Sequence, residues 1–302
     1  MASNPVTISP SPAPRSEAAQ LRLPRGGLAQ DLRAVKIVWQ RDLIRFMRDR
    51  MRIVTALLQP LLYLLVLGTG LTALVNRAGG GLSGSGIDLR TFMFPGVLSM
   101  AVMFTAIFSS GSIVWDREFG FLREMLVAPV SRASIVVGKV LGGATVATFQ
   151  GVVILGLAGL VGVPYSPALL LVIVIELLLL AFTLSAFGVM AAARIKSIQS
   201  FMALIQMAIM PMYFLSGAMF PLSGLPGWLQ VLTRLNPLTY AVDPMRHEVF
   251  AHLNVSPAVR EALAPGVTWG GWRVPVLAEL LIVALMGIVL LGIAIAEFRR
   301  AE

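Results

Sequence analysis

The chain has 302 residues, of which 57% are hydrophobic and only 13% are charged, and its mean hydropathy is +0.83. One water-soluble core cannot bury this much apolar surface, so the composition excludes a soluble globular domain and indicates a membrane protein. The formal net charge of +9 is explained by basic segments that flank membrane spans and meet anionic lipid, rather than by nucleic-acid binding. The absence of cysteine excludes disulfides and thiolate metal sites.

The N-terminal region divides into two parts. Residues 1–27 are rich in Pro, Ser, Ala and Arg and lack the apolar core of a secretory signal, so we expect a disordered cytoplasmic tail. Residues 28–50 place apolar side chains on one helical face and arginines on the other, which predicts a helix in the cytoplasmic membrane interface. Contact with a cytoplasmic partner is compatible with this position. The apolar face comprises Leu28, Leu32, Val35, Trp39, Leu43 and Phe46, and the arginine face comprises Arg41, Arg45, Arg48 and Arg52.

Six later segments are long and apolar enough to cross a bilayer as helices. The backbone in lipid must satisfy its own hydrogen bonds, so the sequence predicts an all-α, polytopic membrane protein. Lys and Arg gather on the side that holds both chain ends, which predicts cytoplasmic termini. The predicted spans are residues 53–75, 91–114, 138–162, 168–193, 198–220 and 274–297.

Motifs typical of soluble enzymes fail on their context. Gly79, Gly81 and Gly84 satisfy GxGxxG, but they lie in a loop after a membrane span, without the strand that precedes a nucleotide site. His247 and His252 are one residue too far apart for the HExxH zinc pair, so we expect no metal. The GxxxxGK[ST] motif is missing from the sequence. We therefore expect no nucleotide binding, no bound cofactor and no enzymatic activity in this chain.

The stretch DREFGFLREMLVAPVSRASIVVGK, Asp116–Lys139, mixes charged and bulky apolar residues between the second and third spans. Phe119, Leu122 and Leu126 share a helical face, and Pro129 ends the segment because a helix does not pass it unbroken. The stretch predicts a short amphipathic helix on the cytoplasmic rim. Its composition is that of a docking surface, and the alternative is a helix that rests on lipid.

Glu176 stands out within the spans, because an ionised carboxylate at mid-membrane costs about 2.5 to 3.5 kcal/mol to insert. Three interpretations stay open: it is protonated, it bonds a neighbouring helix, or it binds a cationic substrate. Other polar or soft side chains in the spans are candidates for a transport pathway, although Ser often bonds its own helix and Met is common filler.

Two long stretches carry a family resemblance. FPGVLSMAVMFTAIFSSGSIVWDREFGFLREMLVAPVSRASIVVGKVLG, Phe94 to Gly142, resembles the signature of the type-2 ABC-transporter permease family. LSGAMFPLSGLPGWLQVLTRLNPLTYAVDPMR, Leu215 to Arg246, is similar to the outer segment before the last span of that family. The likeness extends from about residue 28 to the end, and it is greatest to the branch of the daunorubicin-resistance permeases and the nodulation lipo-oligosaccharide exporter.

The resemblance implies roles for particular segments of one permease domain, residues 28–302. Residues 117–130 would be the coupling helix, which fits a cleft of a cytoplasmic ATPase; its expected contact residues are Arg117, Glu118, Phe119, Leu122, Arg123 and Glu124. Residues 28–50 would be the connecting helix, with Trp39, Arg41, Arg45 and Arg48 beside the same ATPase. Residues 221–248 would be re-entrant outer helices. The expected pathway lining is Gln59, Ser109, Ser110, Glu176, Gln206, Met210 and Tyr213.

The resemblance also implies a function. We expect the permease of an ATP-driven exporter in a bacterial inner membrane, which moves an amphipathic drug-like or lipid-like molecule outward. Two copies of a separate ABC ATPase would bind ATP and Mg, and a second permease copy would complete a homodimer or heterodimer. The alternatives are a permease for a lipid-linked saccharide or glycolipid and, in another class, an ion-coupled secondary transporter, which would usually show inverted repeats. A membrane enzyme would need a clustered nucleophile and base, and the sequence offers none.

Overall fold

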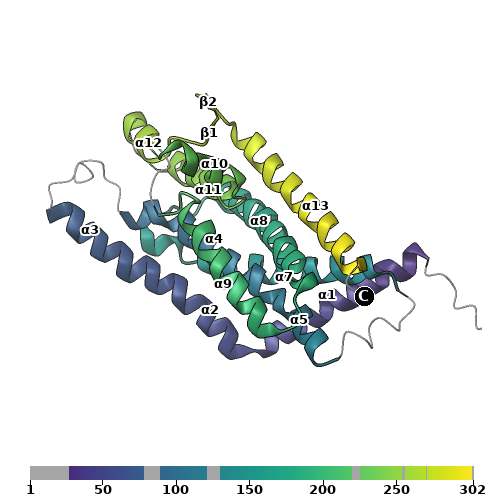
Figure 1. The fold of residues 1–302 in the computed structure, drawn as a ribbon. Helices are drawn as coiled ribbons and strands as arrows, with labels where there is room; N and C mark the ends of the chain where they lie inside the picture. Colours follow the sequence, from purple (N-terminus) through teal and green to yellow (C-terminus); the bar gives the residue numbers. More distant parts are fainter. Residues whose placement is uncertain are drawn as a thin grey trace, which may run out of the picture.

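The computed structural model describes residues 27–77, 89–120, 130–219, 225–253, 256–269 and 271–300. Within these ranges the chain is nearly all helical. One antiparallel hairpin precedes the last helix (Figure 1). The elements are α1 (Leu28–Arg48), α2 (Arg50–Leu62), the π-helical turn η1 (Tyr63–Leu67), α3 (Gly68–Arg77), α4 (Leu89–Ser109), α5 (Gly111–Glu118), α7 (Arg132–Leu155), the 3-10 turn η2 (Ala158–Val161), α8 (Pro167–Arg194), α9 (Ile198–Phe214), α10 (Gly227–Leu235), α11 (Thr239–Ala251), α12 (Pro257–Leu263), β1 (Thr268–Trp269), β2 (Trp272–Arg273) and α13 (Val276–Arg300).

Five helical stretches in the described part of the chain are long and apolar enough to cross a membrane. Each coincides with a predicted span, and the second combines α4 and α5 across a break at Ser110. They are Ile53–Ala73, Leu89–Glu118, Arg132–Leu155, Pro167–Arg194 and Val276–Arg300. The expected all-α, polytopic architecture is therefore supported.

The fifth predicted span, residues 198–220, is shorter than expected. Its helix, α9, has 17 residues and ends at Phe214, and the chain then turns through Gly217, whose φ is 77°. At 1.5 Å per residue α9 is about 25 Å long, less than the roughly 30 Å of a hydrocarbon core. The prediction of an uninterrupted helix to residue 220 is wrong, and a sixth crossing stays a prediction.

Other predicted boundaries also shift. The third span ends at Leu155 instead of residue 162, and the 3-10 turn η2 follows it. The third span begins at Arg132 instead of residue 138, because the Ser131 side chain caps this earlier start by accepting a hydrogen bond from the Ser134 N–H. The interfacial helix ends at Arg48, since Asp49 is not helical. The predicted tail, residues 1–27, lies outside the described residues except for Gly27.

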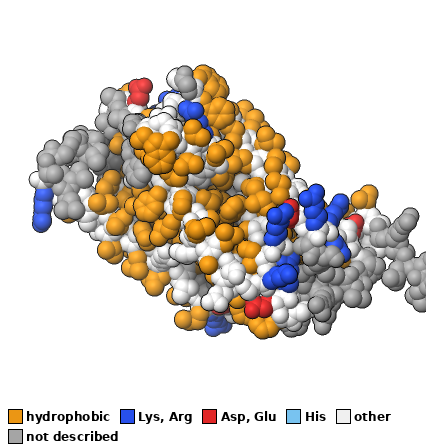
Figure 2. Space-filling model, in the orientation of Figure 1, with side chains coloured by type: hydrophobic (Ala, Val, Ile, Leu, Met, Phe, Trp, Pro, Cys, Tyr) orange, Lys and Arg blue, Asp and Glu red, His pale blue; other side chains and the backbone are white. Residues whose placement is uncertain are grey.

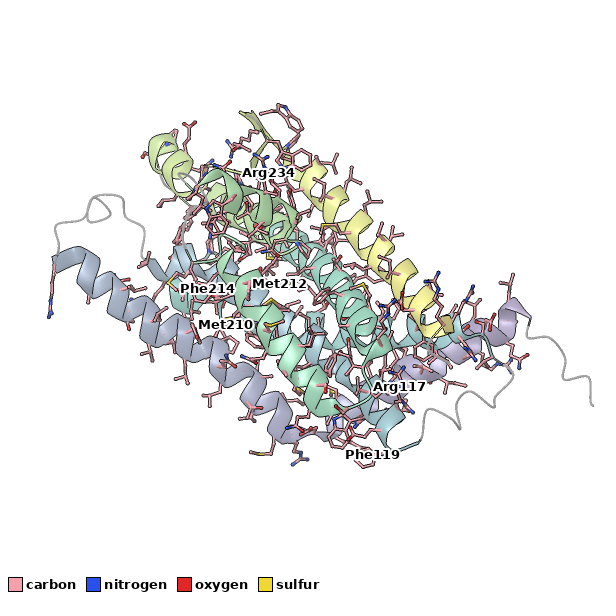
Figure 3. The ribbon with its side chains drawn as sticks, viewed as in Figure 1. Arg117, Phe119, Met210, Met212, Phe214 and Arg234 are labelled. Atoms are coloured by element: carbon pink, nitrogen blue, oxygen red, sulfur yellow. The ribbon has the colours of Figure 1, made fainter. Side chains whose placement is uncertain are left out.

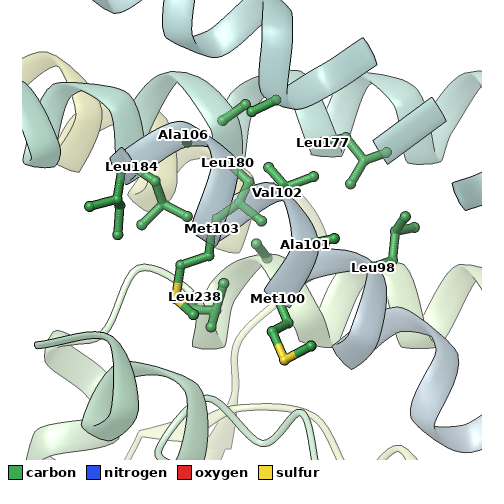
Figure 4. Close-up of a cluster of buried hydrophobic side chains, with 14 of the residues drawn as sticks. Leu98, Met100, Ala101, Val102, Met103, Ala106, Leu177, Leu180, Leu184 and Leu238 are labelled. Carbon is green, nitrogen blue, oxygen red and sulfur yellow. The ribbon is translucent and has the colours of Figure 1, made fainter. Parts of the chain in front are cut away.

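Helix α8 occupies the middle of the bundle and packs against α13, α7 and α4, while α1 lies along α7. In Figure 1, α2 and α3 follow one edge of the molecule and α13 follows the opposite edge. Side chains of α4 and α8 meet in the core, where Met103 of α4 lies near Leu180 of α8 and Leu98 of α4 lies near Leu177 of α8 (Figure 4). The outer faces of the edge helices are apolar, as membrane-facing surfaces require, and basic side chains gather at one end (Figure 2).

The predicted apolar face of α1 is only partly the face that packs. Leu28 and Leu32 are 85% and 69% exposed, whereas Ala34, Val38 and Phe46 are buried. The packed stripe is rotated because α7 approaches α1 most closely at Gly138, where an added Cβ would lie 2.8 Å from Val38 Cβ. Part of the apolar face that the sequence indicated is therefore left on the surface.

Candidate functional site

Helix α5 carries three consecutive charged residues, Asp116, Arg117 and Glu118, and each bonds a different part of the bundle. The helix is a separate eight-residue segment, because the long span that contains it breaks at Ser110. We call these three residues, together with Asp42 of α1 and Lys139 of α7, the charged node. It lies at the end of the molecule that carries α1, which we call the α1 end (Figure 1).

The centre of the charged node is Lys139, which is only 3% exposed. Its ammonium group donates to Asp42 Oδ1 at 3.1 Å, Asp116 Oδ2 at 3.2 Å and Ser112 Oγ at 2.8 Å. Arg41 donates to the same Asp116 oxygen at 2.6 Å. Two carboxylates and two cations thus compensate one another, the condition under which charges are tolerated when buried. This network joins α1, α5 and α7.

Sequence reasoning missed this network, because it counted Lys139 as the edge of a span. A lysine inside an apolar segment, with one aspartate in the preceding helix α5 and another in α1, was the available signal. The partners lie 23 and 97 residues away in the sequence, so only the fold identifies them.

Arg117 caps the end of α8. Its guanidinium donates to the carbonyls of Ala192, Ala193 and Ile195 at 3.1, 2.9 and 2.7 Å, respectively. The last carbonyls of a helix lack partners within the helix and carry partial negative charge, which a cation there neutralises. The structure thus directs Arg117, an expected ATPase contact, into the bundle.

Glu118 performs the converse task at the start of α9. Its Oε2 accepts a hydrogen bond of 2.9 Å from the backbone N–H of Ile198, the first residue of that helix. The N-terminal N–H groups of a helix favour an anion. Close packing supports the contact, since an added Cβ on Gly111 of α5 would lie 3.1 Å from the Phe201 ring.

Of the remaining predicted coupling residues, Phe119 is 61% exposed and its ring lies 5.2 Å from that of Trp115. Figure 3 places Arg117 and Phe119 at the same end of the bundle, far from Arg234. The α-helix stops at Glu118, and Gly120 has a φ of 82°. Residues 117–130 are therefore not one continuous helix. Leu122, Arg123 and Glu124 lie outside the described residues.

The predicted connecting-helix residues have different environments. Trp39 donates a hydrogen bond to Thr145 Oγ1 at 3.0 Å, and Arg41 forms an ion pair with Asp116. Arg45 and Arg48 are exposed. Helix α1 is also fixed near its start, where the Ser131 N–H donates to Asp31 at 3.0 Å. This bond lowers the pKa of Asp31.

Four of the seven predicted pathway residues line one cavity of about 340 Å³. Gln59 comes from α2, and Gln206, Met210 and Tyr213 come from α9, 147 or more positions further along the chain by their residue numbers. We call this space the central cavity, and Figure 3 shows Met210 and Phe214 midway along the bundle. Its described lining holds no charged side chain. The other lining residues are Tyr63, Met100, Phe104, Phe108, Ile209, Phe214 and Met219.

The other three predicted pathway residues lie elsewhere. Ser110 donates to the carbonyls of Ala106 and Ser185, both at 3.3 Å. Ser109 also bonds Ala106, at 3.0 Å, and lines a separate cavity of about 380 Å³ near the α1 end. Glu176 is 2% exposed, and one of its carboxylate oxygens has no hydrogen-bond partner. Both serines thus bond backbone carbonyls, which was the alternative to a role in the transport pathway.

The end opposite the α1 end contains the predicted re-entrant segment, residues 221–248, which forms α10 and α11 where it is described. Helix α10 exposes Trp228, whereas α11 is largely buried. Arg246 of α11 donates to the Gly217 carbonyl at 2.6 Å and stacks over Phe92 at 4.3 Å. In the described ranges, no group of three His, Asp or Glu side chains is placed to hold a metal.

The fold, the uncharged cavity and the charged node together define a multi-pass helical membrane protein with the features of a transport permease. Residues 33–250 match the family described as ABC-2 type transporter, and the chain belongs to this family. It is an ABC transporter permease, which confirms the resemblance drawn from its sequence. Membership implies an ATPase partner.

Named relatives agree with this assignment. A putative transport permease, ycf38, of Cyanophora paradoxa is 31% identical over 70% of this chain and 72% of its own length. Nodulation protein J of Rhizobium leguminosarum bv. viciae is 30% identical over 74% of this chain and 83% of its own length. The inner membrane transport permease YadH of Escherichia coli is 27% identical over 75% and 86%, respectively.

Proposed function

We propose that this permease exports a neutral, amphipathic, drug-like or lipid-like molecule and is driven by a separate ATPase. The central cavity carries the proposal. Two amides and two phenol groups supply hydrogen bonds, while Met and Phe side chains supply a soft apolar wall. The described lining has no carboxylate to pair with a cationic cargo, which favours a neutral one.

The α1 end is proposed to face the cytoplasm and the ATPase. The Lys and Arg distribution supports this orientation, and a bacterial inner membrane is the proposed location. Exposed Phe119, with the predicted contact residues Leu122, Arg123 and Glu124, is proposed to dock the ATPase. Two ATPase copies would bind ATP and Mg, and the permease itself would hold no cofactor and catalyse no reaction.

A second permease copy is proposed to close the central cavity. The cavity is lined from both α2 and α9, and these helices also expose apolar side chains, among them Leu58, Leu62 and Met210. A facing copy would cover these residues and supply the opposite wall. A homodimer and a heterodimer fit this geometry equally.

The alternative cargo, a lipid-linked saccharide or glycolipid, has one observation in its favour. A third cavity, of about 370 Å³, lies between α8, α9, α10 and α13, and its lining is apolar except for Asn236. The Asn236 amide already donates to the Met212 carbonyl at 2.7 Å. Such a space suits an acyl chain.

The test is purification of the tagged permease in mild detergent with its bound ATPase, followed by reconstitution in vesicles. ATP hydrolysis is then measured with a neutral aromatic amphiphile, its cationic amine analogue and a short-chain glycolipid. We expect the neutral amphiphile to stimulate hydrolysis most. Preference for the cation would contradict the proposed cargo, preference for the glycolipid would favour the alternative, and absence of any ATPase would favour a secondary transporter.

A further inference from the structure

We propose that Arg117 and Glu118 are positioning residues that transmit movement of α5 to the turn between α8 and α9, and thereby to the α9 wall of the central cavity. This inference rests on the proposed ATP-driven function. It assigns the two side chains to contacts within the permease, whereas the sequence led us to expect them at the ATPase surface.

The first step concerns the chemistry of the two helix ends. Only residues 195–197 separate α8 from α9, so the carbonyls that end one helix lie close to the N–H groups that begin the next. The first position attracts a cation and the second an anion. Arg117 and Glu118 are adjacent, opposite in sign and placed in this order at the end of α5.

The second step concerns specificity. Arg117 contacts three carbonyls with two guanidinium nitrogens, a fork that a single ammonium group cannot reproduce. Glu118 contacts the first N–H of α9, while the Ser197 hydroxyl accepts from the Ser200 N–H at 3.3 Å. Both ends of the turn are therefore fixed to α5, and Gly111 packs against Phe201 one turn into α9.

The third step links this contact to the central cavity. Helix α9 is continuous from Ile198 to Phe214, and it carries three of the cavity residues, Gln206, Met210 and Tyr213. At 1.5 Å per residue, these lie roughly 12 to 22 Å along the axis from the Glu118 contact. A displacement imposed at the first turn is thus transmitted along the helix to Gln206 and Met210, which both precede Pro211.

The test compares Glu118→Ala, Glu118→Gln, Arg117→Ala and Arg117→Lys in the permease–ATPase complex. We expect all four to retain the ATPase and its hydrolysis, while cargo exported per ATP falls about tenfold for both alanine variants, the order of effect of a charged hydrogen bond. Cargo exported per ATP by Glu118→Gln and Arg117→Lys should lie between the values for the alanine variants and for the unchanged protein, because Gln keeps an acceptor and Lys keeps the charge.

The matched control is Glu297→Ala. Glu297 of α13 pairs with Arg194, the last residue of α8, so its removal disturbs the same helix end without a contact to α5. Export per ATP should be unchanged in this variant. An equal fall would show that any damage to the end of α8 uncouples export, and would overturn the inference.

Hydrogen exchange of the permease without ATPase supplies a readout that does not depend on the proposed function. Glu118→Ala should speed exchange of the first α9 amides, residues 198–201, more than Glu297→Ala does; unchanged exchange would overturn the contact itself. Loss of ATPase binding in Glu118→Ala would show that Glu118 contacts the ATPase, as the sequence predicted, and would overturn the inference. If the unaltered permease purifies without any ATPase, the proposed function fails. The exchange experiment still tests the contact between Glu118 and α9 in that case, because it needs no ATPase.

Discussion

The charged node and the central cavity use opposite physical means within the same bundle. In the node, Lys139, Arg117 and Glu118 have directional partners at 2.7 to 3.2 Å. In the cavity, the described lining is uncharged and includes flexible methionines and aromatic rings. Directional bonds fix one geometry, whereas thioethers adapt to different shapes. The roles proposed for the two regions match this contrast, because force transmission requires fixed geometry and cargo binding requires an adaptable wall.

The largest expected effect comes from breaking the node at its centre. Lys139→Ala leaves Asp42 and Asp116 with Arg41 alone, and loss of one partner from a buried charged network costs about 3 to 5 kcal/mol. We expect a marked drop in the thermal unfolding temperature of the purified protein. Lys36→Ala is the control, because Lys36 is an exposed lysine on α1. Equal stability of the two variants would contradict the structural importance of the network.

Gly138→Ala tests the close approach of α1 and α7 beside the node. The new Cβ would lie 2.8 Å from Val38 Cβ and 3.0 Å from the Val35 carbonyl, and such overpacking costs about 1 to 3 kcal/mol. Gly292→Ala in α13 is the matched control, because its Cβ meets nothing within 4 Å, and alanine favours a helix by up to about 1 kcal/mol. Thermal unfolding should therefore shift in opposite directions, and a shared direction would contradict the packing.

In the cavity, Gln206→Leu should change transport more than stability. The substitution removes one of the two amides from the lining but keeps side-chain volume, so we expect the unfolding free energy to change by less than about 1 kcal/mol. Cargo-stimulated ATP hydrolysis should fall several-fold. Met207→Leu, on the same helix but outside the cavity lining, should leave stimulation intact. Equal stimulation in both variants would remove Gln206 from the proposed cargo site.

The smallest effect is expected for Glu176→Gln. This side chain is buried in α8 away from the central cavity lining, and Gln replaces an incompletely bonded carboxyl group with a neutral amide. Export of cationic and neutral analogues should change by the same small factor. Selective loss of cation export would instead support the interpretation of Glu176 as a cation site.

Hydropathy predicted the helical class and the approximate position of five membrane-spanning stretches. A run of about 20 apolar residues, long enough to cross a bilayer as a helix, can be recognised in the sequence alone. The family resemblance placed Gln59 and Gln206 on the same pathway, and the structure brings both to one cavity. Sequence reasoning did not find the partners of Lys139 or the inward direction of Arg117. These depend on contacts across 23 to 97 residues and on helix ends that only tertiary packing brings together.

The π turn in the first span has a geometric consequence. Such a turn holds one residue more than a regular α-helix, and one residue corresponds to a rotation of about 100° and a rise of 1.5 Å. Gln59 and Tyr63 face the cavity at or before the turn, whereas Leu65 and Val66 within it are exposed. Because this wide turn absorbs the extra residue, deleting one residue from it would restore a regular α-helix, shorten the span only slightly and leave the half beyond facing nearly the same way. The π turn thus keeps both halves of the span in register with the bundle, whereas the same residue added to a regular helix would rotate the far half by about 100°.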